Sequence, residues 1–166
     1  MSNLMPGVSP AQQFASHLLA TLVAGGAKRI FLAPGARSQA LAIAAGQLAE
    51  VGKAELFIRL DERSLGFTAL GSALATDDPA IVITTSGTAV ANLHPAVLEA
   101  HHSGVPLILL TADRPHELRG FGANQTTEQV GIFADAVRVC FDVEAPDEDG
   151  SLDSIEELAR IALTAA

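Results

Sequence analysis

Short, strongly apolar runs alternate with longer segments of helical pattern along nearly the whole chain. The runs that we predict to be strands span residues 30–33, 55–60, 80–84, 106–111 and 137–143. Helical patterns occupy residues 39–51, 64–75 and 88–100, the segment between Pro10 and the Gly25–Gly26 pair, and the chain from about Asp153 onward. Strict alternation of this kind predicts a parallel sheet whose strands are joined by right-handed helical crossovers. We therefore predict an α/β fold, a three-layer sandwich around a central, mostly parallel sheet of five or six strands.

The composition fits strands that are buried on both faces. Hydrophobic residues make up 49% of the 166 residues, whereas aromatic residues make up only 4%, and Trp and Tyr do not occur. A core of this kind is built from Ala, Val, Ile and Leu, which is typical of parallel strands covered by helices. The length is that of one domain, which we place over residues 1–166.

Local signals set several helix ends. Ser9, Pro10 and Gln12 form a capping-box pattern at the start of the first helix. Asp61 is a good N-cap for the helix that follows the second predicted strand. The stretch from residue 113 to about residue 127 has no periodic pattern, and we expect a short helix after it, up to Phe133.

The charge balance excludes several classes of partner. Nineteen acidic residues outweigh ten basic ones, which gives a net charge of −9 and argues against contacts along a nucleic-acid backbone. No stretch approaches about 18 consecutive apolar residues, and the first residues lack the pattern of a signal peptide. We therefore expect no nucleic-acid partner, no membrane insertion and a cytoplasmic location. Cys140 falls in the predicted strand over residues 137–143 and is expected to be a buried thiol.

Polar, turn-forming clusters come directly after four of the predicted strands. They are Ala33–Ser38, Leu60–Arg63, Ser86–Thr88 and Asp113–Pro115. In an open parallel sheet, ligands bind at the carboxyl ends of the strands. We therefore expect one composite site along one edge of the sheet, with the loop at residues 122–125 supplying neutral amides.

Taken alone, each cluster has both a structural and a functional interpretation. Glu62 complements a helix dipole, or it exchanges a proton with a ligand as a half-buried carboxylate. Arg37 is a surface charge, or it clamps a carboxylate. The Ser86–Gly87 pair starts a helix, where free backbone N–H groups also favour anions. The segment Asp113–Pro115 is a local ion pair and turn, or it is part of the site.

Several common chemistries have no motif in this chain. No Gly-x-Gly-x-x-Gly follows a strand, and no Gly-x4-Gly-Lys-Ser/Thr occurs. The five histidines are either adjacent or scattered, so we expect no metal-binding set among them.

Five ordered motifs resemble one enzyme family. They are Ala33–Ser38, Asp61–Arg63, Ser86–Leu93, Thr111–Pro115 and Gly122–Gln125, with natural spacing between about residues 30 and 135. On these motifs the chain is similar to the 2-succinyl-5-enolpyruvyl-6-hydroxy-3-cyclohexene-1-carboxylate synthases of menaquinone biosynthesis. The resemblance implies a thiamin-diphosphate-dependent carboligase, a transferase. Such an enzyme decarboxylates 2-oxoglutarate and adds the succinyl-semialdehyde carbanion to isochorismate.

The resemblance also implies that this chain is one domain of a longer enzyme. Family members have an N-terminal pyrimidine-binding domain, a middle domain and a diphosphate-binding domain that holds Mg²⁺. This chain resembles the first domain alone, and it contains no Gly-Asp-Gly…Asn diphosphate motif. We therefore expect the piece to be inactive by itself. The family's active site lies between two chains, which implies a homo-oligomer, either a dimer or a tetramer.

Carried over residue by residue, the resemblance assigns catalytic and binding roles. Glu62 matches the acid that hydrogen-bonds N1′ of the aminopyrimidine ring and so promotes loss of the thiazolium C2 proton. Glu62 is thus expected to be catalytic and to bind the cofactor, together with the Ser86–Gly87 pair. The residues that match substrate-binding positions are Arg37, Arg114 and Gln125, and none matches a metal ligand.

Two other interpretations remain open from the sequence. The chain could be the α subunit of a two-chain thiamin-dependent 2-oxoacid decarboxylase, although the Gly-Ala-Asn-Gln and Asp-Arg-Pro motifs argue against it. It could also be a non-catalytic ligand-binding module of the same fold, although the presence of Glu62 argues against that. Ala36 departs from the family pattern, which more often has Ser before the arginine, so we expect no hydroxyl contact to substrate there.

Overall fold

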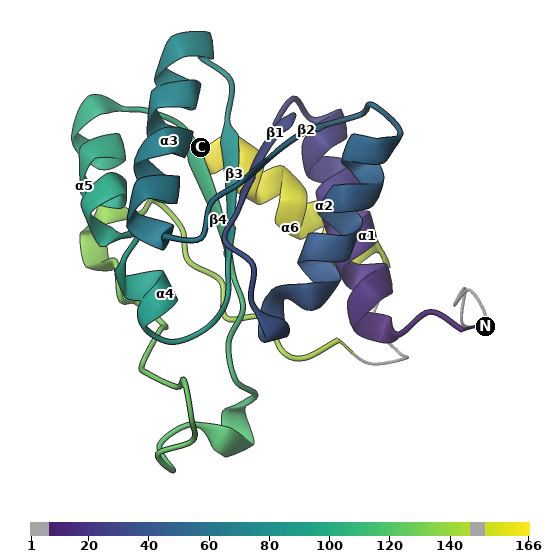
Figure 1. The fold of residues 1–166 in the computed structure, drawn as a ribbon, viewed down its shortest axis with the longest axis vertical. Helices are drawn as coiled ribbons and strands as arrows, with labels where there is room; N and C mark the ends of the chain where they lie inside the picture. The colour runs from purple at the N-terminus through teal and green to yellow at the C-terminus, as the bar shows by residue number, and fades with distance from the viewer. Residues whose placement is uncertain (1–6, 147–151) are drawn as a thin grey trace.

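The computed structural model describes residues 7–146 and 152–166, and its centre is one parallel sheet (Figure 1). The strands are β1 (Arg29–Leu32), β2 (Glu55–Ile58), β3 (Ala80–Thr84) and β4 (Leu107–Thr111), in the order β2-β1-β3-β4. Every neighbouring pair is parallel. The predicted α/β class and parallel sheet are confirmed, but the described residues form four strands rather than five or six.

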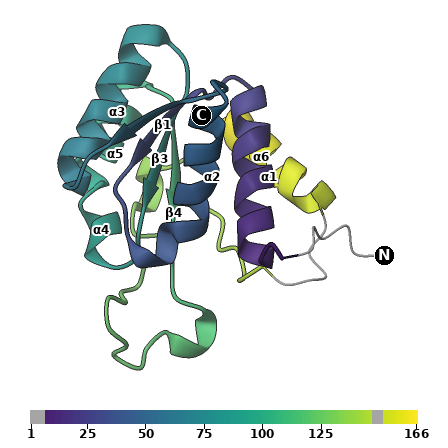
Figure 2. The same ribbon diagram turned by 45° about the vertical axis from the view of Figure 1, so that its right-hand side comes forward.

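Helices cover both faces of this sheet (Figure 2). One face is covered by α1 (Pro10–Ala24), α2 (Gln39–Glu50) and α6 (Leu152–Ala165). The other face is covered by α3 (Glu62–Thr76), α4 (Thr88–Ala91) and α5 (His94–Ser103). The structure therefore has the predicted three layers.

Side chains of the central strands alternate between two apolar cores. Ile30 and Ile81 pack toward α1 and α2, whereas Phe31 and Val82 pack toward α3 and α5. Phe31 also stacks on Phe57 of β2, with ring centres 4.9 Å apart. Every residue of β3 is buried, as expected for a wholly apolar strand with helices on both sides.

Capping residues explain most helix ends. The Ser9 Oγ accepts a hydrogen bond from the Gln12 N–H at 3.3 Å, so the predicted start of α1 is confirmed. Asp61 caps α3, which begins at Glu62, slightly earlier than predicted. The predicted helix over residues 88–100 is instead divided into α4 and α5. The break falls where Pro95 enters the first turn of α5, because proline has no N–H for a bond to the preceding turn.

The predicted fifth strand over residues 137–143 is wrong. Within the described part of the chain this segment pairs with no strand, and Val139, Phe141 and Val143 are partly exposed. The alternation of apolar residues is a strand pattern, but a strand also needs a hydrogen-bonded neighbour, and none lies beside this segment. Cys140 was expected to be a buried thiol, but it is exposed, because the segment that contains it is not part of the sheet.

The short helix expected before Phe133 is also not formed. The chain makes turns through this region and then a one-turn 3-10 helix at Ala134–Ala136. Gly131 has a φ of +73°, which an α-helix does not accommodate.

The outer side of β4 is open. The Ala112 N–H donates to Thr84 O at 3.0 Å, toward β3. Because backbone groups alternate sides along a strand, those of Leu109 and Thr111 point away from β3. A largely apolar cavity of about 810 Å³ lies along this edge and is bounded on its far side by residues 137–146. Among the residues that the structure describes, β4 therefore has no partner strand on its outer side.

Candidate functional site

The polar segments that follow β1 and β3 meet at one edge of the sheet. The chain leaves β1 toward β2 and leaves β3 toward β4, so the connections diverge between these two neighbouring strands. Such a switch point opens a crevice at the carboxyl ends of the strands, where open α/β sheets bind ligands. The loops at residues 33–38 and 85–87 come into contact there.

The close approach of these two loops depends on Gly35. A Cβ at this position would lie 2.7 Å from Thr85 Oγ1 and closer still to Thr85 Cβ. Next to it, the buried Ser38 donates from its Oγ to Gly35 O at 3.1 Å. The Ser38 hydroxyl therefore serves the turn itself.

Two arginines donate to one main-chain oxygen. Arg37, in a one-turn 3-10 helix at Ala36–Ser38, donates from Nη1 to Ser86 Oγ at 3.0 Å and from Nη2 to Asn124 O at 3.1 Å. Arg114 donates from Nη2 to the same Asn124 oxygen at 2.8 Å. Neither arginine forms an ion pair with any acid in the described part of the chain. Both guanidinium charges therefore remain available to an anion.

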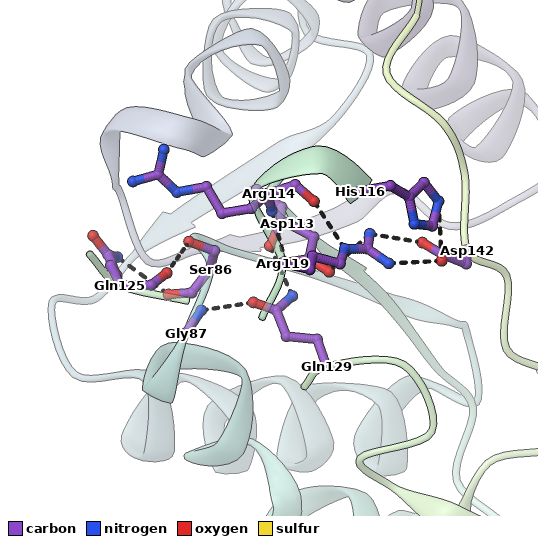
Figure 3. A network of polar contacts seen from close by, with 10 residues as sticks. Ser86, Gly87, Asp113, Arg114, His116, Arg119, Gln125, Gln129 and Asp142 are labelled. Carbon is purple, nitrogen blue, oxygen red and sulfur yellow. Dashed lines mark hydrogen bonds and ion pairs between the residues drawn. The ribbon is translucent and has the colours of Figure 1, made fainter. Parts of the chain in front are cut away.

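Ser86 and Gln125 hold each other through two hydrogen bonds (Figure 3). The Ser86 Oγ donates to Gln125 O at 2.9 Å, and the Gln125 Nε2 donates to Ser86 O at 3.1 Å. Ser86 is fully buried, and the next residue, Gly87, has a φ of +81°, which favours glycine. A Cβ at Gly87 would also press against Gln125 at 3.1 Å. The pair thus fixes the loop at residues 122–125 over the end of β3.

The structure brings most of the predicted site residues together, but Glu62 stands apart from this network. The residues joined by hydrogen bonds are Arg37, Ser86, Arg114 and Gln125, with Gly87 next to them. Glu62 is the first residue of α3, follows the carboxyl end of β2 and is half-buried. Its carboxylate makes no hydrogen bond to another described residue, so it is free to bind a ligand.

Asp61, and not Glu62, is the N-cap of α3. The Asp61 Oδ1 accepts a hydrogen bond from the Ser64 N–H at 2.7 Å. This backbone bond, followed by the contribution of the Ser64 hydroxyl, holds the pKa of the Asp61 carboxyl below its ordinary value. The structural interpretation of the Asp61–Glu62 pair therefore explains Asp61 fully and Glu62 only in part.

Asp113 forms its ion pair with Arg119, not with the adjacent Arg114. Arg119 Nη2 lies 3.0 Å from Asp113 Oδ2, and the same guanidinium binds both carboxylate oxygens of Asp142 at 2.8 and 3.0 Å (Figure 3). Hydrogen bonding to Arg119, with the charges of Arg119 and His116, lowers the pKa of Asp142. Sequence reasoning missed Arg119 and Asp142 because the two lie 23 residues apart and outside any motif.

Gln129 is another residue that sequence reasoning missed. Its side chain is buried and bridges two loops: Oε1 accepts from the Gly87 N–H at 2.7 Å, and Nε2 donates to Ala112 O at 3.0 Å. The only signal in the sequence is an amide next to the apolar residues 130–133, which is too common to single out.

Buried polar atoms without partners gather at this edge. Those of the described residues are Thr84 Oγ1, Thr85 Oγ1 and Arg114 Nε. Unpaired buried polar atoms are costly, so their presence at the ends of β3 and β4 fits a site that binds a polar ligand. Residues 7–146 and 152–166 contain no group of three or more His, Cys, Asp or Glu residues placed to hold a metal. Over the same residues, no helix has the length and apolar character needed to cross a membrane.

The chain is similar to one family of enzymes over most of its length. The family described as "Thiamine pyrophosphate enzyme, N-terminal TPP binding domain" matches residues 12–136. The 2-succinyl-5-enolpyruvyl-6-hydroxy-3-cyclohexene-1-carboxylate synthase of Leifsonia xyli subsp. xyli is 54% identical over 155 residues, which are 93% of this chain and 26% of that protein. The synthase of the same name from Kineococcus radiotolerans is 56% identical over 140 residues, covering 84% of this chain and 25% of the relative. The chain spans about a quarter of the length of these curated relatives.

Proposed function

The chain belongs to the thiamine pyrophosphate enzyme family as an N-terminal TPP-binding domain, and from this premise we propose that it is the pyrimidine-binding domain of a synthase acting on 2-oxoglutarate and isochorismate. In the proposed reaction, 2-oxoglutarate loses carbon dioxide and the remaining four-carbon unit is transferred to isochorismate. The similarity to synthases of that name supports this reaction over that of a two-chain decarboxylase. Because the chain spans about a quarter of those relatives, the activity belongs to a longer protein, to which this domain contributes part of the site.

The two arginines that pair with no acid among the described residues carry the proposal. Both substrates bear carboxylates, and a chain with a net charge of −9 attracts such anions only where fixed cations are directed at them. Arg37 and Arg114 meet at the Asn124 oxygen, next to the Gln125 amide. We assign Arg37, Arg114 and Gln125 to substrate binding, with Arg37 on a substrate carboxylate.

Glu62 suits the aminopyrimidine ring of thiamin diphosphate. A half-buried carboxyl group that bonds to no other described residue can accept a hydrogen bond from a protonated ring nitrogen when ionised, or give a proton to it when protonated. We place the Glu62 carboxylate at N1′ of the ring, with Ser86 and Gly87 lining the ring at the buried end of β3. When bound, thiamin diphosphate supplies the nucleophilic carbon and the electron sink that decarboxylation needs.

In this proposal the diphosphate and Mg²⁺ are held by protein outside this chain. The residues described here offer no acidic cluster for a metal, and the sequence contains no Gly-Asp-Gly…Asn motif. Thiamin diphosphate therefore needs a second domain to complete its site.

We further propose a homo-oligomer, a dimer or a tetramer, in the cytoplasm. Large apolar side chains are exposed on and near α3: Leu60 at 85%, Leu74 at 69% and Phe67 at 40%. Exposed apolar groups of this kind mark surfaces that other protein covers. A single cysteine fits a reducing compartment.

Replacing Glu62 in a full-length synthase that carries this domain tests the proposal. Glu62→Gln keeps the size of the side chain and removes its proton exchange, so turnover should fall by about 100- to 10,000-fold with the fold intact. Carbon dioxide release from 2-oxoglutarate measures turnover, and circular dichroism measures the fold. Glu99→Gln, exposed on α5, is the matched control and should keep normal turnover. Near-normal turnover in Glu62→Gln would contradict the assigned role.

A further inference from the structure

Gln129 uses both ends of its amide to join two loops that are far apart in sequence (Figure 3). Its Oε1 accepts a hydrogen bond from the Gly87 N–H, which lies 42 residues away in the turn after β3. The Ala112 carbonyl to which it donates lies 17 residues away, just after β4. Gln129 therefore spans the ends of the two strands with one side chain, which is 8% exposed.

The Gly87 end of this bridge holds an unusual stretch of backbone. Gly87 is buried and has a φ of +81°, a conformation that glycine adopts readily, so the hydrogen bond to its N–H adds a constraint that a side chain does not supply there. Gln129 supplies the acceptor for that N–H. The peptide before Gly87 carries the Ser86 oxygen, and this oxygen accepts from Gln125 Nε2 at 3.1 Å. Fixing Gly87 thus fixes the orientation of Ser86.

Ser86 in turn holds Arg37. The Ser86 Oγ accepts from Arg37 Nη1 at 3.0 Å and donates to Gln125 O at 2.9 Å. A shift of the backbone at Ser86 and Gly87 would move this hydroxyl and the guanidinium bound to it. The path from Gln129 to Arg37 therefore consists of two hydrogen bonds joined by the covalent Ser86–Gly87 backbone.

We infer that Gln129 is a positioning residue that sets the direction of the Arg37 guanidinium through Gly87 and Ser86. The inference rests on the proposed role of Arg37 as a ligand of substrate carboxylate. A neutral amide suits the task, because Gln129 lines the same cavity as Arg37 and Arg114. A carboxylate there would compete with substrate for two guanidiniums that have no acidic partner among the described residues.

Hydrogen exchange of the 166-residue chain tests the bridge without any need for activity. Gln129→Met removes both hydrogen bonds, whereas Gln129→Glu keeps an acceptor for Gly87 and loses the donor to Ala112. We expect Gly87 amide exchange, followed by NMR, to speed up on the order of tenfold in Gln129→Met. It should change little in Gln129→Glu and in the control Gln47→Met, which is exposed on α2. Unchanged exchange at Gly87 in Gln129→Met would overturn the inference. An equal loss of protection at core amides such as Val82 would also overturn it, because it would show a role in stability alone.

Kinetics of the full-length synthase test the consequence for Arg37. Gln129→Met should raise KM for a carboxylate substrate about tenfold, and it should weaken thiamin diphosphate binding by a smaller factor, because Gly87 also lines the proposed cofactor ring. Gln129→Glu should also raise KM although it keeps Gly87 protected, because it places a competing charge in the cavity. A KM that stays constant while Gly87 loses protection would overturn the link to Arg37. If the wild-type synthase does not bind either substrate, the proposed function fails, and the exchange result still decides whether Gln129 fixes Gly87.

Discussion

Arg37 and Arg114 share one carbonyl oxygen, and this arrangement leaves most of their hydrogen-bonding capacity unused. A guanidinium has five N–H donors, and Arg37 commits one from each terminal nitrogen to the protein. The shared oxygen carries no formal charge, so it orients the two side chains without neutralising them. At the scale of single residues, the site is therefore built to hold cations in place for an anion.

Arg37→Ala should separate substrate binding from cofactor binding in a full-length synthase. Loss of charge-assisted hydrogen bonds to a carboxylate should weaken substrate binding about 10- to 100-fold. Binding of thiamin diphosphate should hardly change, because the proposal places Glu62, not Arg37, on its ring. Titration calorimetry with each ligand measures both affinities, and Arg63→Ala, exposed on α3, is the control. Equal losses for substrate and cofactor would count against the assignment.

At the scale of elements, the sequence predicts those helices and strands that depend on local residue patterns alone. β3 and the capped start of α1 follow from an unbroken apolar run and from Ser9. The segment over residues 137–143 has an equally good strand pattern, but strand formation depends on a neighbour that no local pattern encodes. The motifs predicted that loops meet at one sheet edge, because this follows from the order of strands and helices along the chain. They did not predict that Asn124 offers its main-chain oxygen or that Gln129 bridges two of the loops, because such contacts depend on tertiary structure.

Two glycines with different surroundings test how elements meet at the site. Gly35 has a φ of −159°, an extended conformation that any residue adopts, so an added methyl acts only through its overlap with Thr85. Gly35→Ala should therefore destabilise the chain by about 1–3 kcal/mol. Gly46→Ala, in the middle of α2 with no atom near its added Cβ, should instead stabilise it by about 0.5–1 kcal/mol. Urea unfolding of both variants measures the difference, and a neutral Gly35→Ala would show that the loops are not in close contact.

At the scale of the whole molecule, acidic residues outnumber basic ones, and some are held in the ionised form by partners. The pKa values of Asp142, Asp61 and Glu157 are lowered, by hydrogen bonds from Arg119, Ser64 and Arg160. Through Asp142, Arg119 joins the loop after β4 to the segment that bounds the open edge of the sheet. Among the described residues, an ion pair rather than a paired strand thus links that segment to the rest of the domain.

Acid should weaken the folded state through these same carboxyls. A carboxyl with a lowered folded-state pKa contributes stability above its ordinary value, which is 3.8 for Asp142, and loses that contribution as pH falls through the folded-state pKa. The free energy of unfolding should therefore decline as pH drops below about 4. Asp142→Asn should lower stability at neutral pH and flatten this decline, as measured by urea unfolding across the pH range. Asp135→Asn, on the exposed turn at Ala134–Ala136, is the control, and an unaltered acid profile in Asp142→Asn would refute the role of the pair.

The oxygen that receives both arginines belongs to the backbone of Asn124, and this has a consequence for mutational scans of the domain. Alanine scanning deletes side-chain atoms only, so it leaves this acceptor in place at position 124. A scan would thus score the residue by its amide group and overlook the atom on which the cationic pair converges. Its contribution can be tested only by altering the peptide unit itself. Replacing the amide with an ester, for example, weakens the carbonyl as an acceptor.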